Sequence, residues 1–330
     1  MPPDQAWKRI AAESYALPKA RLIKELSSYS HHYDVACGGA RYVLSQVKRS
    51  PDRLPFPLQF KIISLLQRGG VTSVNMPVPT VDGRRYVEDT GHYWFLRNYR
   101  PHDKVIWRGA PMLVQAAARE LADIHRAGTG YRIAALGGVG TTHLAPYYQP
   151  VEAFLSASES AYHAAGTTGL PFEDRCLLAK TLRDLREYGQ KMLDESRSRG
   201  LVGITHHDYR PDNILVRDRQ IIEILDWDCA SVDHQLYDLA FAALQYGQRQ
   251  CLHDADIGLA YLFIHRYLTE RGLEHLPGEL MWWFLRFTVA KRVLIKGRNN
   301  ERMRLLRLLD MGPLPCRLPD IAAQWGKDES

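Results

Sequence analysis

The chain has 330 residues, of which 45% are hydrophobic, 24% charged and 10% aromatic. This ordinary globular composition excludes wholesale disorder and collagen-like or coiled-coil architectures, and the length predicts two lobes or domains. The formal net charge of +6 is a mild excess. It permits an anionic partner such as a nucleotide phosphate, and it does not make nucleic acid the expected ligand.

The N-terminal segment MPPDQAWKRIAAESY has no apolar run that could act as a signal sequence. No later stretch approaches the roughly 20 apolar residues of a membrane span. We therefore expect a cytoplasmic protein without a membrane partner, and no sequence feature indicates its oligomeric state. The five cysteines are widely spaced and form no C-x-x-C pair, so reduced, packed thiols are expected.

The first part of the chain is expected to form a small mixed lobe that opens with β structure. Residues 20–48 alternate as strands do, and Gly38-Gly39 would form the turn of an antiparallel hairpin. Further elements are predicted as a helix at 60–66 and strands at 85–87 and 93–96. Breaker residues at 97–103 indicate a linker to the second lobe.

Helical periodicity dominates from Pro111 onward. One apolar face extends from Val114 to Ile124 in a helix expected to end near Gly128, and a second stripe extends from Leu178 to Met192. Between these helices and the later ones lies a compact pair of strands, predicted at 214–216 and 221–225 and joined by the turn 217–220.

Polar residues flank this pair of strands in a pattern that carries chemistry. His206, Asp208 and Asn213 form H-x-D-x-x-x-x-N before the first strand, and Asp226 and Asp228 form D-x-D after the second. A hairpin brings its two ends side by side, so these groups should converge. Phosphoryl transfer needs a carboxylate to accept the proton of the attacking hydroxyl. It also needs an Asn oxygen and a second carboxylate to hold magnesium against the nucleotide phosphates.

The pattern resembles the aminoglycoside phosphotransferase and choline kinase superfamily, whose relatives include a bacterial stress-response kinase and spore-coat-associated kinase-like proteins. The segments Leu121–His125 and Tyr237–Ala240 also match. The resemblance implies an α+β, bilobal protein-kinase-like fold. In it, residues 1–97 form a small N-lobe that binds nucleotide, and residues 98–330 form a larger, mainly helical C-lobe with the catalytic loop and acceptor site.

The resemblance also implies an ATP- or GTP-dependent phosphotransferase that acts on a hydroxyl of a small molecule, with antibiotics among the candidate acceptors. Asp208 would be the catalytic base, Asn213 and Asp226 the Mg2+ ligands, and His206 a support of the loop. The nucleotide would contact a phosphate-loop-like segment and the main chain of the linker, namely Ser28, Tyr29 and Ser30, and Arg97, Asn98 and Tyr99. Asp228 and Asp238 receive no definite role.

The chain departs from the family pattern at two positions of the N-lobe. Ser45 stands where the family has a phosphate-holding lysine, and Gln59 stands near the place of the lysine's glutamate partner. Lys48 is the nearest cation in sequence and is our candidate nucleotide contact. Strand parity puts it on the opposite face unless a bulge changes the register. The alternative hypothesis is a kinase-like binding or scaffold protein with weak or no activity.

Two other interpretations of the sequence are less favoured. The adjacent pairs His31-His32 and His206-His207 suggest zinc, but neighbouring side chains on a strand point apart and no spacing completes a site. Basic residues between 286 and 307 suggest an anion-binding or nucleic-acid surface. We expect instead a packed helix with a solvated cationic face, because no binding motif accompanies the charges.

Overall fold

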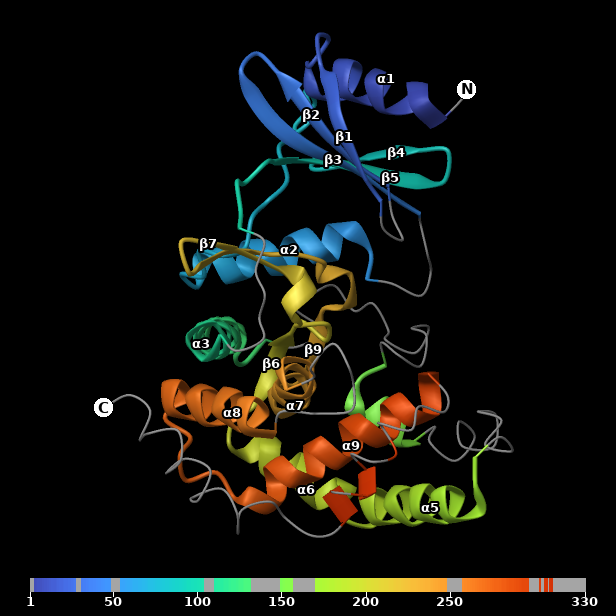
Figure 1. Cartoon of the computed structure of the whole chain (residues 1–330), viewed down its shortest axis with the longest axis vertical. Helices are drawn as coiled ribbons and strands as arrows, with labels where there is room; N and C mark the ends of the chain where they lie inside the picture. The colour runs from blue at the N-terminus through green and yellow to red at the C-terminus, as the bar shows by residue number, and fades with distance from the viewer. Residues whose placement is uncertain are drawn as a thin grey trace.

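The computed structural model describes residues 3–27, 31–48, 54–103, 110–131, 149–156, 170–247 and 257–296, together with residues 303, 306, 307, 309 and 310. Within these ranges the chain forms two lobes stacked along its longest axis (Figure 1). One lobe contains a five-stranded sheet and the other is mainly helical, as expected. Among the described residues, no helix combines the length and the apolar character that a membrane crossing requires.

The N-lobe sheet is antiparallel throughout, in the order β1-β2-β3-β5-β4. Its strands are β1 (Arg21–Ser27), β2 (His31–Cys37), β3 (Ala40–Lys48), β4 (Val87–Asp89) and β5 (His92–Asn98). Gly38 and Gly39 have φ angles of 58° and 83° and close the β2–β3 hairpin. Such a two-residue turn needs positive φ at both positions, so the predicted hairpin is confirmed.

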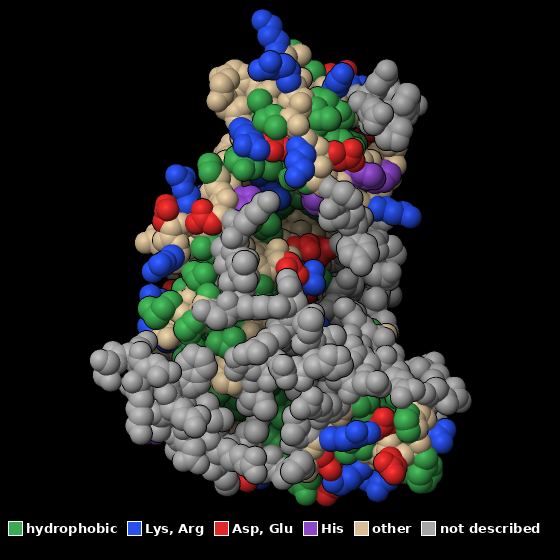
Figure 2. Space-filling model, viewed as in Figure 1, with side chains coloured by type: hydrophobic (Ala, Val, Ile, Leu, Met, Phe, Trp, Pro, Cys, Tyr) green, Lys and Arg blue, Asp and Glu red, His purple; other side chains and the backbone are tan. Residues whose placement is uncertain are grey.

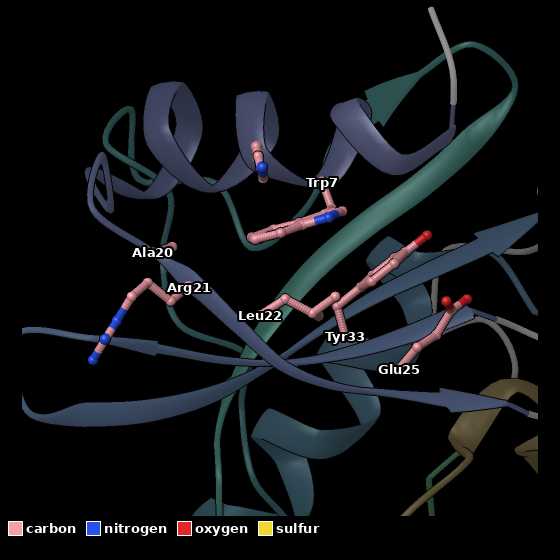
Figure 3. Close-up of a pocket in the computed structure, with 7 residues that line it drawn as sticks. Trp7, Ala20, Arg21, Leu22, Glu25 and Tyr33 are labelled. Atoms are coloured by element: carbon pink, nitrogen blue, oxygen red, sulfur yellow. The ribbon is translucent and has the colours of Figure 1, made fainter.

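A helix, α1 (Pro3–Tyr15), precedes the sheet, so the expectation that β structure opens the chain is wrong. Trp7 and Ile10 are buried in one cluster with Tyr33 and Trp94 of the sheet. A short amphipathic helix is marginal alone, and packing on the sheet is what stabilises it. A pocket of about 420 Å³ lies beside α1, on the same side of the sheet (Figure 3).

The opposite face of the sheet is turned toward α2 (Phe56–Arg68), which contains the predicted 60–66 helix. The Phe56 ring lies 4.7 Å from Tyr93 and 5.1 Å from Phe95, measured between centroids. Other buried residues of α2 belong to the same hydrophobic cluster as the C-lobe helices. The helix therefore joins the sheet to the main core.

The C-lobe consists of helices around two small antiparallel strand pairs, β6 with β9 and β7 with β8. The helices are α3 (Pro111–Gly128), α5 (Phe172–Glu187), α6 (Gly189–Ser198), α7 (Gln235–Tyr246), α8 (Ile257–Arg271) and α9 (Gly278–Lys296). The strands are β6 (Val202–Thr205), β7 (Ile214–Arg217), β8 (Gln220–Ile224) and β9 (Ser231–His234). The stripe predicted from Leu178 to Met192 spans two helices, because the chain breaks at Tyr188.

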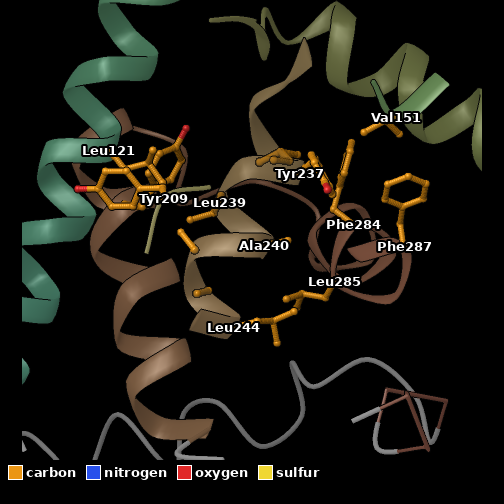
Figure 4. Packing of buried hydrophobic residues seen from close by; sticks show 14 of the residues in the cluster. Leu121, Val151, Tyr209, Tyr237, Leu239, Ala240, Leu244, Phe284, Leu285 and Phe287 are labelled. Atoms are coloured by element: carbon orange, nitrogen blue, oxygen red, sulfur yellow. The ribbon is translucent and has the colours of Figure 1, made fainter. Parts of the chain in front are cut away.

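Helix α7 lies at the centre of this lobe. Figure 4 shows Leu239 and Ala240 on it, with Tyr209 beside Leu121 of α3 on one side and the rings of Tyr237, Phe284 and Phe287 on the other. This packing fixes the base of the loop that carries Asp208, since Tyr209 is fully buried and donates a hydrogen bond to the Ala117 carbonyl at 2.9 Å.

Two basic residues of α9 are buried, which corrects the expected solvated cationic face. Arg286 pairs with Asp184 and Asp310, each at 3.1 Å. Lys291 donates to the Gln149 carbonyl at 2.7 Å and lies 4.7 Å from the Tyr237 ring centroid. Burial lowers the pKa of Lys291 to about 8. Both side chains find their polar partners inside the C-lobe, and the sequence concealed this because the partners come from distant segments.

Candidate active site

Asp208 and Asn213 lie on the loop between β6 and β7, which is shortened by a 3-10 turn, η4 (Pro211–Asn213). The turn folds the Asn213 side chain back, so that its Nδ2 donates to Asp208 Oδ2 and to the Asp208 carbonyl, both at 2.9 Å. Both side chains are largely buried. With Nδ2 engaged in this way, Oδ1 is the Asn213 atom oriented as a free oxygen donor.

Asp226 lies next to Asn213 because the β7–β8 hairpin closes there. Ile214 pairs with Ile224, and the Leu225 N–H donates to the Asn213 carbonyl at 2.8 Å. Asp226 then leaves the strand in a left-handed conformation, with φ 63° and ψ 60°, and its side chain is exposed. Left-handed backbone is tolerated by Asp and costs energy that functional sites often carry.

His206 connects the two ends of the site. Its Nε2 donates to the Leu225 carbonyl at 2.9 Å, and its Nδ1 accepts from the Asp208 N–H at 3.2 Å. These two bonds require the neutral tautomer protonated on Nε2. The histidine thus ties the loop of Asp208 to the residue before Asp226, which is the supporting position that the resemblance implied.

A buried network centred on Asp238 of α7 anchors the same loop. Asp238 accepts the main-chain N–H groups of His206 at 2.7 Å and His207 at 3.0 Å, and His125 of α3 approaches its carboxylate at 3.1 Å. Burial raises the pKa of Asp238, but the hydrogen bond with His125 opposes this effect, and the pKa is lowered overall. Burial lowers the pKa of His125, whose Nδ1 accepts from Tyr267 at 2.6 Å. Sequence reasoning left Asp238 without a role.

The surroundings of the Asp208 carboxylate raise its affinity for a proton. Burial raises its pKa, while the charge of Arg210 lowers it and that of Asp226 raises it again, with a net rise. Arg210 Nε lies 3.2 Å from Asp208 Oδ2. Sequence reasoning missed Arg210, although a cation two residues after a candidate base was a visible signal.

The hollow between the lobes gathers acidic side chains below the sheet (Figure 2). Asn213 Oδ1 and the Asp226 carboxylate give two oxygen donors, and Mg2+ commonly uses one or two protein oxygens together with substrate phosphates and water. The donor set therefore fits magnesium. In the part of the chain that the structure describes, no three or more His, Cys, Asp or Glu residues are grouped to hold a metal ion, so nothing there favours the zinc alternative.

A profile of the phosphotransferase enzyme family matches residues 23–275, which is more than half of the chain. The chain belongs to this family. A search of curated protein sequences finds no match.

Solved structures share the fold of this phosphotransferase at low sequence identity. A microcompartment-associated aminopropanol kinase is 15% identical, with a TM-score of 0.60 over 93% of this chain and 94% of that chain. An amicoumacin kinase in complex with AMP-PNP, Ca2+ and Ami is 14% identical, with 0.58 over 97% and 94%. The GDP complex of an aminoglycoside 2'-phosphotransferase is 14% identical, with 0.58 over 98% and 99%. These matches confirm the protein-kinase-like fold, and the family confirms a small-molecule phosphotransferase with an alcohol group as acceptor.

In this phosphotransferase, Ser45, at the position where the sequence comparison led us to expect a lysine, lies in a closed environment. The Ser45 side chain is fully buried, and its Oγ lies 2.9 Å from His32 Nδ1. Burial lowers the pKa of His32 to about 4, with a further lowering by Arg97 and an opposing effect of Asp226. Gln59 donates to the Leu54 carbonyl at 2.7 Å, so its amide serves the start of its own helix.

The other predicted nucleotide contacts have mixed placements. Lys48 pairs with His92 on a strand whose register is regular, so it lies on the face opposite Ser45 and is exposed. The structure does not bring it to the cleft. The Tyr99 N–H donates to the Arg41 carbonyl at 2.9 Å and is therefore used within the sheet. Arg97 does face the cleft, through its side chain. The predicted contacts at Ser28, Tyr29 and Ser30, and the side chain of the neighbouring Ser27, lie outside the described residues.

Proposed function

We propose that this phosphotransferase moves the γ-phosphoryl group of ATP or GTP to a hydroxyl of a small molecule, with Asp208 as the catalytic base. The observation that carries the proposal is the hydrogen bond from Asn213 Nδ2 to Asp208 Oδ2. It fixes one carboxylate oxygen and leaves the other for the acceptor hydroxyl. The bound AMP-PNP and GDP of the solved structures support a nucleoside triphosphate as donor.

In phosphoryl transfer, the residues of this chain would have the following roles. Asp208 orients the hydroxyl and takes its proton, and the raised pKa makes its carboxylate a better acceptor. Asn213 Oδ1 and Asp226 would hold Mg2+, which when bound neutralises charge on the phosphates. The Asp238 network and His206 keep the loop in place. The Asp208 carboxylate is therefore held in position before the reaction, and little reorganisation is needed during it.

The acceptor is proposed at the level of a hydroxylated small molecule, with antibiotics and amino alcohols as the first candidates. The names of the solved structures include both kinds of substrate. The C-lobe surface next to Asp208 would contact it. The described residues of the C-lobe include both acidic and basic side chains, so their charge by itself favours neither a cationic nor an anionic acceptor.

The test is a screen of hydroxylated antibiotics, amino alcohols and sugars with ATP and GTP labelled on the γ-phosphate. We expect at least one labelled product, and an Asp208→Asn variant should lose about 100- to 10,000-fold in turnover while nucleotide affinity stays near the wild-type value. A loss of less than about tenfold with a verified acceptor would remove Asp208 from the role of base.

A specific observation also favours a second function, nucleotide binding with little turnover. Ser45 is buried against His32, and Lys48 points away from the cleft. A protein that binds ATP or GTP tightly in thermal-shift measurements, and yields neither labelled product nor nucleotide hydrolysis in the presence of Mg2+, would fit this alternative.

A further inference from the structure

The cleft-facing side of the N-lobe sheet carries a cation that does not lie on β3. Ser45 pairs with Phe95 and Val43 pairs with Arg97, and paired residues of neighbouring strands share a face. Phe95 packs against Phe56 of α2, so this is the face turned toward the C-lobe. The Arg97 side chain therefore enters the same space as Ser45.

The Arg97 side chain runs back along β5 toward the level of Ser45. Its guanidinium carbon lies 5.8 Å from the centroid of the Phe95 ring, and Phe95 is the register partner of Ser45. Arg97 and Asp226 both act on the pKa of His32, in opposite directions, behind the larger effect of burial. His32 itself lies 2.9 Å from Ser45, measured from Nδ1 to Oγ, so the positive charge of Arg97 acts on the immediate neighbour of Ser45.

A carboxylate from the other lobe faces this cation. Arg97 Nη1 lies 3.5 Å from Glu223 Oε1 of β8, and Arg100 Nε lies 3.8 Å from Glu223 Oε2. Glu223 is buried and has two guanidinium groups near it, so the cluster keeps an excess of positive charge. Arg97 is 21% exposed, and its Nε has no hydrogen-bond partner among the described residues.

We propose that Arg97 binds the phosphate chain of the nucleotide, with Glu223 as its partner, so that the ion pair missing at Ser45 and Gln59 is relocated to β5 and β8. This inference rests on the proposed function. A guanidinium matches phosphate oxygens with two parallel hydrogen bonds, so an arginine reaching from β5 is chemically suited to the task. The buried Glu223 holds the side chain in position.

The experiment compares the affinities of wild type and Arg97→Met for ATP, GTP, adenosine and guanosine by titration calorimetry. We expect the substitution to weaken triphosphate binding by about 10- to 100-fold and to leave nucleoside binding unchanged. Arg100→Met is the matched control, since it also removes a cation from Glu223. It should change triphosphate and nucleoside affinities by the same small factor.

Equal losses for triphosphate and nucleoside in Arg97→Met would mean that Arg97 shapes the base pocket, and would overturn the proposal. Unchanged triphosphate affinity would overturn it too. If wild type binds neither ATP nor GTP, the proposed function itself fails, which separates the two failures.

A measurement on the wild-type protein covers the case in which Arg97→Met does not fold. Phenylglyoxal modifies accessible arginines, and mass spectrometry reports the extent at each one. We expect tripolyphosphate and the bound triphosphate to protect Arg97, and adenosine or guanosine to leave it reactive, with Arg100 as the internal reference. Arg97 labelling that triphosphate and tripolyphosphate leave unchanged would contradict the proposal.

Discussion

Asp226 and Asp228 show how neighbouring carboxylates acquire different environments. Asp226 is exposed in a left-handed conformation at the end of the hairpin, next to Asn213. Asp228 is buried, and its Oδ1 accepts from Cys229 Sγ at 3.1 Å. Only Asp226 presents its oxygens to the cleft beside the amide oxygen, so the two should respond differently to magnesium.

Asp226→Asn should weaken Mg2+-dependent binding of ATP or GTP by about tenfold or more, because the ion loses an anionic oxygen ligand. Nucleotide titration at increasing Mg2+ concentration measures this. Asp228→Asn is the matched control and should keep the wild-type Mg2+ dependence. The opposite pattern, in which only the Asp228 variant loses it, would transfer the ligand role to Asp228.

The proximity of Asp208, Asn213 and Asp226 could be predicted from sequence because it is local. A hairpin of known length joins Asn213 to Asp226, and the turn chemistry of the loop is readable. The pair of Arg97 and Glu223 could not be predicted, since its members are 126 residues apart and meet only when the lobes pack. Arg210 was predictable in principle and was overlooked.

Among the elements, β3 decides which of its side chains face the cleft. It pairs with β2 and β5 without a register shift, and side chains alternate across a regular strand. The side chain of Ser45 therefore faces the cleft and that of Lys48 faces away. The alternation of side chains along β3 could be predicted from sequence, whereas the absence of a bulge in this strand could not.

Lys48→Ala should leave the affinity for ATP and GTP within about twofold of wild type, because an exposed lysine on the far face contributes little to a ligand in the cleft. Calorimetric titration of both nucleotides measures it, with Arg97→Met as the sensitive comparison. A loss of tenfold or more would indicate that β3 changes register when nucleotide binds.

Other elements show where sequence patterns lose their power. Helix α1 was missed because its few apolar positions stand among charged residues, and only the sheet beneath it stabilises the helix. Helix α9 was predicted, yet Arg286 and Lys291 were expected in solvent. Their burial depends on Asp184, Asp310 and the Gln149 carbonyl, whose positions follow from tertiary packing.

At the scale of the whole molecule, the buried hydrophobic residues form two clusters, and hydrogen bonds between distant segments form a polar boundary between the lobes. One cluster joins α1 to the far face of the sheet, and the other joins α2 to the C-lobe helices. Arg100 Nη1 donates to the Ile222 carbonyl at 2.7 Å, and the Ile224 N–H donates to the Ser73 carbonyl at 2.8 Å. The bilobal fold was predictable from the motif and its resemblance, whereas this boundary depends on contacts between distant segments.

Each lobe also contains a histidine whose pKa is lowered, His32 partly buried in the N-lobe and His125 fully buried in the C-lobe. Burial lowers the pKa of His32 in the N-lobe from 6.5 to about 4, and burial also lowers the pKa of His125 in the C-lobe. The unfolded chain binds protons at these sites near pH 6.5, while the folded chain does not. Their contribution to stability is therefore complete above that pH and is lost as the pH falls toward the folded pKa.

The free energy of unfolding should consequently fall between about pH 7 and about pH 5, by about 2 kcal/mol for His32 alone and by more with His125 included. Urea unfolding at the two pH values measures the difference. His32→Gln can keep a hydrogen bond to Ser45 but cannot be protonated, so it should reduce the pH dependence by about 2 kcal/mol. His31→Gln, at the exposed neighbouring position, should retain the full wild-type dependence. Equal pH dependence in wild type and His32→Gln would show that His32 is protonated as readily in the folded chain as in the unfolded one. The contact between a neutral His32 and Ser45 would then be contradicted.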